Sequence, residues 1–366
     1  DVYKRQYLDR LFNAGRDHDW ALVGAGVRAA DSAMRDALMA QDWLTTVVEQ
    51  GVDSSRASVT GAMVDFVPPA NPEALLERMT DPAIRIVSMT ITEGGYFINP
   101  SSGAFDPADR SILKDAANPE APETVFGLIG LALARRRATG TPAFTVMSCD
   151  NIPHNGVVAR NAVVGLAKLH DPDLAAWIEG EATFPNAMVD RIVPATTDAQ
   201  RHELSQAFGI DDNWPVFCED YIQWVISGEF AQGRPALEEV GVQFVADVTP
   251  FEFMKIRILN GGHATIAYPA RLLDVHFVHE AMQHPLIGPF LAKVEAEEIV
   301  PTVLPVPGVD IPDYLELIQR RFANPKIADT NARLAFDGSS RQPKFILPPA
   351  RDQLAAGRSV AGLALV

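Results

Sequence analysis

Apolar runs of strand length alternate with amphipathic helical segments from residue 7 to about residue 245, and this alternation restricts the fold more than any other feature. The apolar runs are Trp20–Val23, Leu44–Val48, Ile84–Met89, Phe144–Met147 and Met188–Val193. The helical segments include Ala33–Ala40, Pro72–Met79 and Val125–Ala138. Such alternation predicts a mainly parallel sheet with helices on both faces. The expected fold class is therefore α/β with a doubly wound sheet.

The strand pattern ends after Asp247-Val248-Thr249-Pro250, and helical patterns dominate the rest of the chain. We therefore expect residues 7–246 to form the α/β domain and residues 247–366 a mainly α-helical second domain, with Val300–Pro312 as a rigid loop. Residues 1–6 include no initiator methionine and are left out of the fold prediction. Val360–Val366 stops within an apolar helical pattern without a stop signal. These two observations predict a fragment that lacks both termini of a longer protein.

Composition excludes several classes of partner. The chain is 47% hydrophobic and 21% charged, with no apolar run long enough for a membrane span. A formal net charge of −16 argues against nucleic acid and anionic membranes as partners. Cys149 and Cys218 are too few for a disulfide framework, so a reducing cytoplasm is the expected compartment.

One segment of the second domain places several polar side chains on one helix. At roughly 100° per residue, His263 lies about 80° and Asn260 about 140° from Lys255, and Glu252 lies about 60° away. All four fall within less than half of the helix surface. The intervening apolar residues would seat this helix in a core, where a polar arc is costly unless it is paired or used.

A second polar segment, Ser148–Gly156, follows the apolar run Ala143–Met147, which has the pattern of a buried parallel strand. Ligands of open α/β sheets bind beyond the carboxyl ends of such strands. The segment contains Asn151 and His154. It is therefore a candidate wall of a ligand-binding cleft.

Gly24-Ala25-Gly26-Val27-Arg28-Ala29 lies between a strand and a helix and matches G-x-G-x-x-[GA], with Glu49 about twenty residues later. This pattern is typical of a dinucleotide-binding turn, although a glycine-rich turn without a ligand is an equal alternative.

These segments together resemble the polyol-specific long-chain dehydrogenase/reductase family, from about Tyr7 to the last residue. The resemblance implies a Rossmann-like α/β domain followed by a mainly helical substrate domain. It also implies a different register, in which Trp20–Gly26 is the second strand and Asp31 binds the adenosine ribose. An aspartate there would repel the 2′-phosphate of NADP, so NAD is the expected cofactor. Glu93 and Val189 would lie near the nicotinamide, and Asn151 between cofactor and substrate.

Alcohol oxidation requires a base for the hydroxyl proton and donors for the developing alkoxide. The eight histidines are scattered and no paired cysteines occur, so we expect no metal. Lys255 can act as the base if burial and positive neighbours lower its pKa. Asn151 and Asn260 could then form an oxyanion hole, and the matching family residues have these roles.

The resemblance assigns further roles in substrate binding and proton exchange. His263 would hold the substrate and position the lysine. Glu252 would guide proton exchange with solvent, with a structural i,i+3 ion pair to Lys255 as the alternative. Asp190, Arg333 and Arg341 match substrate contacts. Arg341 replaces the lysine commonly found there, which leaves the length or terminal group of the substrate open.

The resulting hypothesis is an NAD-dependent, metal-free dehydrogenase that interconverts D-mannitol and D-fructose and acts as a monomer. A hexuronate reductase acting on D-fructuronate or tagaturonate, or an arabinitol or sorbitol dehydrogenase, is the alternative within the family. A non-catalytic sugar- or nucleotide-binding protein is the alternative from another class. Simple binding, however, does not require a base beside a carbonyl oxygen.

Overall fold

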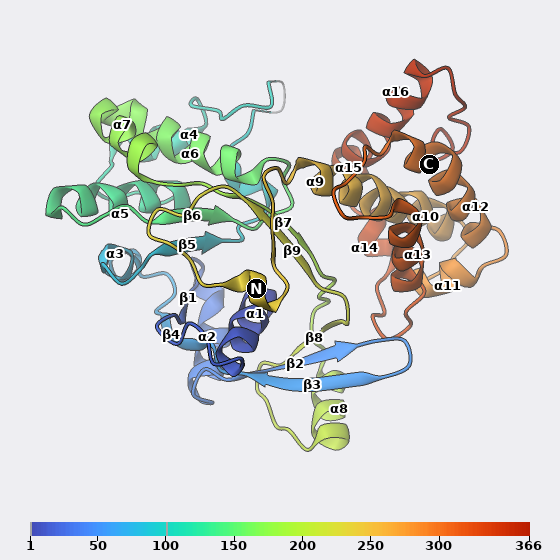
Figure 1. The fold of residues 1–366 in the computed structure, drawn as a ribbon, viewed down its shortest axis with the longest axis horizontal. Helices are drawn as coiled ribbons and strands as arrows, with labels where there is room; N and C mark the ends of the chain where they lie inside the picture. The colour runs from blue at the N-terminus through green and yellow to red at the C-terminus, as the bar shows by residue number, and fades with distance from the viewer. Residues whose placement is uncertain (1, 100–101) are drawn as a thin grey trace.

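The computed structural model describes residues 2–99 and 102–366, apart from the side chains of Glu93 and Ser340. Two regions lie side by side (Figure 1). The α/β region, residues 2–244, contains every named strand, and the helical region, residues 249–366, consists mainly of helices. The predicted fold class, a Rossmann-like domain followed by a helical domain, is confirmed.

Two parallel strand pairs form the part of the sheet that is flanked by helices. β1 (Leu22–Ala25) pairs with β4 (Met63–Val67), and β5 (Ile86–Met89) pairs with β6 (Thr145–Ser148). β6 is wholly buried, as its apolar pattern predicted, because helices cover it.

The other strands depart from the expected parallel order. β7 (Asn186–Asp190) runs antiparallel to β9 (Gln223–Ser227), which pairs with β10 (Gln243–Phe244). β2 (Thr45–Gln50) and β3 (Ser55–Thr60) form an antiparallel hairpin, with β8 (Val216–Glu219) parallel to β2. Leu44–Val48 was expected in a parallel sheet, and β2 does pair in parallel with β8, but a tight turn after Gln50 also pairs it antiparallel with its immediate successor β3.

Helices cover the strands of the α/β region (Figure 1). They are α1 (Val2–Asn13), α2 (Ser32–Met39), α3 (Pro72–Thr80), α4 (Arg110–Ala117), α5 (Val125–Thr139), α6 (Asn155–His170), α7 (Pro172–Glu181) and α8 (Asp198–Phe208). Short 3-10 turns are η1 (Ala29–Asp31), η2 (Glu93–Tyr96) and η3 (Leu237–Val240).

Residues 1–6 were excluded from the fold prediction, but residues 2–6 are part of the folded structure. They form the first half of α1, and Val2, Tyr3 and Gln6 are buried. The ring of Tyr3 packs edge-on against Trp224 on β9 at 5.3 Å between centroids. Apolar burial therefore makes these residues part of the folded α/β region.

The helical region comprises α9 (Thr249–Lys255), η4 (Ile256–Asn260), α10 (Gly261–Leu272), α11 (Val278–Gln283), α12 (Ile287–Val294), η5 (Glu295–Ile299), η6 (Val300–Thr302), α13 (Ile311–Phe322), α14 (Asn331–Ala335), α15 (Gly338–Phe345) and α16 (Leu347–Ala355). η4 and η5 are π-helical segments. Its apolar core includes Met188 of β7 and Val225 of β9, so the packing is continuous across the two regions.

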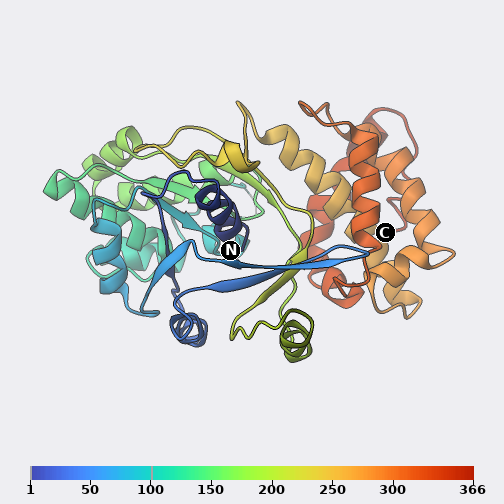
Figure 2. The ribbon, with the colours of Figure 1, turned by 60° about the horizontal axis from the view of Figure 1, so that its bottom comes forward.

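The tip of the β2–β3 hairpin reaches the helical region (Figure 2). The buried side chain of Asn324, just after α13, donates a hydrogen bond of 2.9 Å to the carbonyl oxygen of Gln50 at the hairpin turn. This contact fixes the hairpin against the helical region at a point remote in sequence.

Arg136 of α5 is a buried cation that holds the ends of two strands together. It donates hydrogen bonds to the carbonyl oxygens of Met79, Asp81, Ile84 and Pro142, at 2.5 to 2.8 Å. These carbonyls belong to the segments that precede β5 and β6.

We expect Arg136→Met to lower the free energy of unfolding by about 2–4 kcal/mol, because it leaves buried carbonyl oxygens without donors. Urea unfolding measures this effect. Arg137→Met, at an exposed neighbouring position, is the control and should change stability by less than about 0.5 kcal/mol. Equal effects of the two substitutions would contradict this account of Arg136.

Candidate active site

Lys255 ends α9, and the helix continues through the π-helical segment η4 into α10. The predicted single helix is therefore present, with one irregular turn. In a π-helix hydrogen bonds join residues i and i+5. Asn260, five residues after Lys255, thus lies about one turn above it, closer to the lysine face than an α-helix would place it. Short π-helical segments occur frequently at functional sites.

The amine of Lys255 reaches across from the helical region to the α/β region. Nζ donates a hydrogen bond of 2.6 Å to Oδ1 of Asn151, and a second one to the carbonyl oxygen of Val189. Lys255 is only 7% exposed. Burial lowers its pKa, and the positive charge of Arg321 acts in the same direction. The predicted meeting of Lys255 and Asn151 is confirmed.

Asn151 lies in the loop between β6 and α6, and its buried neighbour Asp150 fixes that loop. The Asp150 carboxylate accepts hydrogen bonds from the backbone N–H groups of Ile91 and Thr92 and from the hydroxyl of Tyr96. The loops after β5 and β6 are therefore joined at the carboxyl ends of both strands. The amide oxygen of Asn151 faces Lys255, which leaves its two N–H donors for another acceptor.

Glu252 packs against the start of α6. Both carboxylate oxygens accept from the backbone N–H of His154, at 3.2 and 3.1 Å. Burial raises the pKa of Glu252, although this backbone hydrogen bond acts in the opposite direction. Glu252 thus accepts hydrogen bonds from the backbone at the N-terminus of α6. Glu252 and Lys255 do not form the i,i+3 ion pair that was the alternative.

His263 lies on α10 and is buried. Its ring stacks on Phe322 of α13, with centroids 4.0 Å apart and an interplanar angle of 18°. Burial lowers the pKa of His263 to about 3, so the imidazole is neutral at physiological pH. A neutral imidazole offers one donor and one acceptor, which suits a sugar hydroxyl.

Asp190, at the end of β7, is part of a buried ion-pair network that the sequence analysis did not predict. Arg321 of α13 donates to both oxygens of Asp190, at 2.7 and 2.8 Å. It also donates to both oxygens of Glu219 on β8, at 2.8 and 2.7 Å. No local motif marks Arg321 or Glu219, because their partners are separated by roughly a hundred residues or more.

Arg333 and Arg341 belong to α14 and α15. The guanidinium of Arg333 forms an ion pair with Asp329 and remains largely exposed. Arg341 lies over the ring of Phe345, at 5.2 Å from its centroid. Both cations lower the pKa of His263, and Arg333 also acts on Arg341, so the three groups lie within electrostatic reach of one another.

The residues predicted to hold the cofactor lie in two places. Val189 contacts Lys255 through its carbonyl oxygen. Asp31 lies just before α2, where its carboxylate accepts the backbone N–H of Arg28 at 3.0 Å. Glu93 begins η2, but its side chain lies outside the described residues.

The local fingerprint that combined Gly24–Ala29 with Glu49 is not supported by the strand arrangement. Glu49 lies on β2, which pairs with β3 and β8 and not with β1. Its carboxylate accepts hydrogen bonds from Arg191 and Arg10. The other register, in which Asp31 is the acidic residue, stays a prediction.

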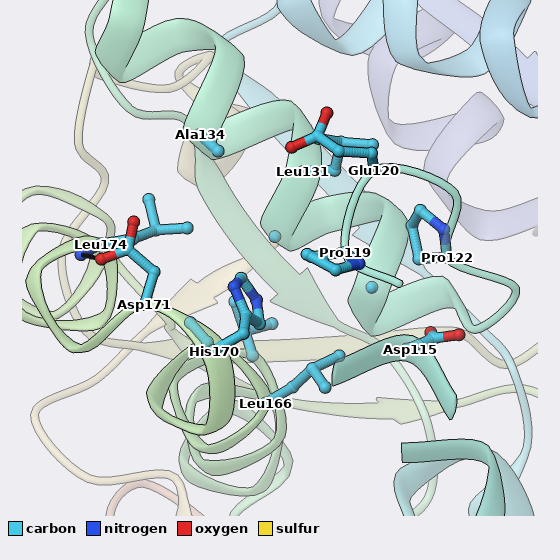
Figure 3. A pocket seen from close by; sticks show the side chains of 14 residues that line it. Asp115, Pro119, Glu120, Pro122, Leu131, Ala134, Leu166, His170, Asp171 and Leu174 are labelled. Carbon is cyan, nitrogen blue, oxygen red and sulfur yellow. Dashed lines mark hydrogen bonds between the residues drawn. The ribbon is translucent and has the colours of Figure 1, made fainter. Parts of the chain in front are cut away.

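Two hollows lie outside the Lys255 site. One of about 100 Å³ lies among α4 to α7 and is lined by residues such as Asp115, Leu131 and His170 (Figure 3). Another of about 320 Å³, beyond β4, is lined by Arg35, Asp65 and others. Neither includes a predicted site residue.

Within residues 2–99 and 102–366, no group of three or more His, Cys, Asp or Glu side chains is arranged to hold a metal ion. None of the helices in this part of the chain combines the length and hydropathy needed to span a bilayer.

A Rossmann-like region joined to a helical region, with a buried lysine at the joint, is the arrangement of a two-domain oxidoreductase. The chain belongs to the mannitol dehydrogenase family. The model of the mannitol dehydrogenase Rossmann domain matches residues 3–239, and that of the mannitol dehydrogenase C-terminal domain matches residues 247–366.

Individual relatives support this family membership. Mannitol 2-dehydrogenase of Cereibacter sphaeroides is 59% identical over all of this chain and 76% of its own length. The polyol:NADP oxidoreductase of Gluconobacter oxydans is 44% identical over 94% of this chain and 72% of its own length. The structure of Pseudomonas fluorescens mannitol 2-dehydrogenase in ternary complex with NAD and D-mannitol has a TM-score of 0.92 and 46% identity, covering 99% of this chain and 74% of that one.

Glu295 is a buried acid behind the helix that carries His263. Its residue exposure is 0%, and Oε2 accepts a hydrogen bond of 3.0 Å from Gln319. A Cβ atom at Gly262 would lie 2.5 Å from Oε1, so a larger residue there would force this carboxylate to shift. Burial raises the pKa of Glu295 to about 8.

This raised pKa predicts a pH-dependent stability. Between pH 4.5 and about 8 the unfolded chain releases the Glu295 proton and the folded protein retains it, so this group lowers stability as pH rises. Glu295→Gln imitates the neutral acid and should be more stable than the parent at pH 9, by up to a few kcal/mol, and similar near pH 5. Urea unfolding across this range measures the difference. Glu297→Gln, at an exposed position, is the control, and a difference independent of pH would contradict the prediction.

Proposed function

We propose that the protein is an NAD-dependent, metal-independent polyol dehydrogenase that interconverts D-mannitol and D-fructose. The observation that carries this proposal is the 2.6 Å hydrogen bond from the buried amine of Lys255 to the exposed Asn151, at the carboxyl ends of β6 and β7. A base and an amide donor from two regions thereby meet where α/β folds bind ligands. The named activities of the mannitol 2-dehydrogenase relatives agree with it.

In the proposed reaction, Lys255 accepts the proton of the substrate hydroxyl. Asn151 and Asn260 donate hydrogen bonds to the same oxygen and stabilise its developing negative charge. Bound NAD would supply the acceptor for the hydride that leaves the carbon. In the reverse direction the lysine returns the proton to the carbonyl oxygen. Burial favours the uncharged amine that the oxidation requires.

The carboxylate of Glu252 would exchange the proton between Lys255 and solvent. Support for this comes from its pKa, which burial raises, and from the electrostatic influence it exerts on Lys255. Because it also fixes the backbone of His154, loss of Glu252 would disturb the Asn151 loop as well.

NAD fits the residues of the α/β region. Asp31 presents a carboxylate just beyond β1, where an acidic side chain can bind ribose hydroxyls and would repel a 2′-phosphate. Glu93, Val189 and Asn151 would lie along the nicotinamide half. NADP is the less favoured alternative.

His263, Asp190, Arg333 and Arg341 would bind the remainder of the polyol. The two arginines within electrostatic reach of His263 also favour a second candidate, a hexuronate reductase, because a carboxylate at the substrate end would pair with a guanidinium. Sorbitol or arabinitol would serve as a neutral alternative. We further propose a monomeric, cytoplasmic protein that binds neither nucleic acid nor membrane.

Initial-rate measurements with several substrates separate these candidates. With NAD, kcat/KM for D-mannitol should exceed those for D-sorbitol, D-arabinitol and D-mannonate, and NADP should be a poorer cofactor than NAD. Faster oxidation of mannonate would establish the uronate alternative and overturn the mannitol assignment. Absence of turnover with all four substrates would overturn the proposed enzyme class.

We expect Lys255→Ala to lower kcat for mannitol oxidation by about 10²–10⁴-fold, because general base catalysis contributes a factor of this size. NADH binding, followed by fluorescence titration, should change little. Lys293→Ala, at an exposed position on α12, is the matched control and should retain full turnover. Unchanged turnover of Lys255→Ala would exclude this residue as the base.

A further inference from the structure

Arg321 is a buried cation whose positive charge acts on the Lys255 amine. It belongs to α13, is 5% exposed, and divides its guanidinium between Asp190 and Glu219. The guanidinium also lies 4.3 Å from the ring centroid of Tyr221. Its planar, permanently charged group matches this double carboxylate site in a way that an ammonium group cannot.

The charges that surround Lys255 come from several elements. Asp190 of β7, Glu219 of β8 and Glu252 of α9 are acidic and favour the protonated amine, whereas Arg321 of α13 opposes it. His263 of α10 also lies within electrostatic reach of Asp190, but it is neutral at physiological pH. Asp190 follows Val189, whose carbonyl oxygen accepts from the amine, so without Arg321 two carboxylates within electrostatic reach of Lys255 would have no compensating charge.

The acids respond to Arg321 in turn. Burial by itself would raise the pKa of Asp190, but the guanidinium outweighs this effect and holds it below its ordinary value. Burial raises the pKa of Glu219, and Arg321 offsets only part of that. Both carboxylates therefore depend on the same cation.

We propose that Arg321 is a positioning residue for the Lys255 base: it neutralises Asp190 and Glu219, so that the amine can lose its proton at the pH of catalysis. This inference rests on the proposed function, since it assigns Lys255 the role of a proton acceptor. The side-chain hydrogen bonds of Arg321 go to Asp190 and Glu219 and none goes to Lys255, so it acts through these two acidic partners.

The first test is the pH dependence of mannitol oxidation by Arg321→Gln. Loss of the cation should move the acidic limb of the kcat/KM profile to higher pH, with activity near pH 7 falling about tenfold or more relative to activity near pH 10. Arg321→Lys keeps the charge but not the hydrogen-bond geometry, so its acidic limb should lie closer to that of the parent than the limb of Arg321→Gln does. Arg320→Gln, at an exposed neighbouring position, is the control. A lower rate with an unshifted limb would show a purely structural role and overturn the proposal.

Glu219→Gln provides a test of opposite sign. It removes a negative charge that favours protonated Lys255, so the acidic limb should move to lower pH. If Arg321→Gln does not fold, this variant still tests whether the charges of the Arg321 network set the pKa of Lys255. A shift to higher pH, or no shift, would contradict the proposal.

A measurement without turnover separates this inference from the proposed function. The chain has only seven lysines, so protein labelled with ¹³C at lysine Cε gives few NMR signals, and the Lys255 signal is the one that Lys255→Met removes. The titration midpoint of that signal should rise in Arg321→Gln and fall in Glu219→Gln. Absence of polyol turnover would overturn the proposed function alone, whereas unmoved midpoints would overturn the role of Arg321.

Discussion

The buried amine of Lys255 is the interaction on which the site depends. An amine removed from water is costly unless hydrogen bonds replace its hydration. Asn151 and the carbonyl oxygen of Val189 supply these bonds, and both belong to the α/β region. The two regions must therefore pack in one orientation for the lysine to be accommodated. The same burial lowers the pKa of Lys255. Burial is therefore the reason both for the hydrogen bonds across the two regions and for the uncharged amine that the proposed base requires.

The network around Arg321 extends this coupling between the regions. It joins α13 to the ends of β7 and β8 through two carboxylates. The apolar core also crosses the joint, since Met188 and Val225 pack with the helices. Breaking a buried ion pair leaves an uncompensated charge, so such a network resists relative movement of the parts it connects. The ion-pair network and the shared apolar core together fix the position of Lys255 relative to Asn151.

Much of this arrangement could be predicted from local patterns. Strand and helix positions followed from periodicity, and the resemblance to a known family brought Lys255 and Asn151 together correctly. Arg321 and Glu219 were missed because a charged residue on an amphipathic helix has no local sign of its distant partner. The π-helical segment after Lys255 was missed for a similar reason, since residues 256–260 have an ordinary helical pattern. The antiparallel hairpin β2–β3 was missed because strand pairing is not encoded in single-strand periodicity.

The sequence by itself determined the fold class and the order of helices and strands, because these depend on the local spacing of apolar residues. It also determined which polar side chains lie at the carboxyl ends of strands. Only the tertiary structure decided which of them meet, how deeply Lys255 is buried, and which charges surround it. Those properties arise from contacts between residues about a hundred positions apart, and the energy of such contacts depends on burial that no local segment possesses.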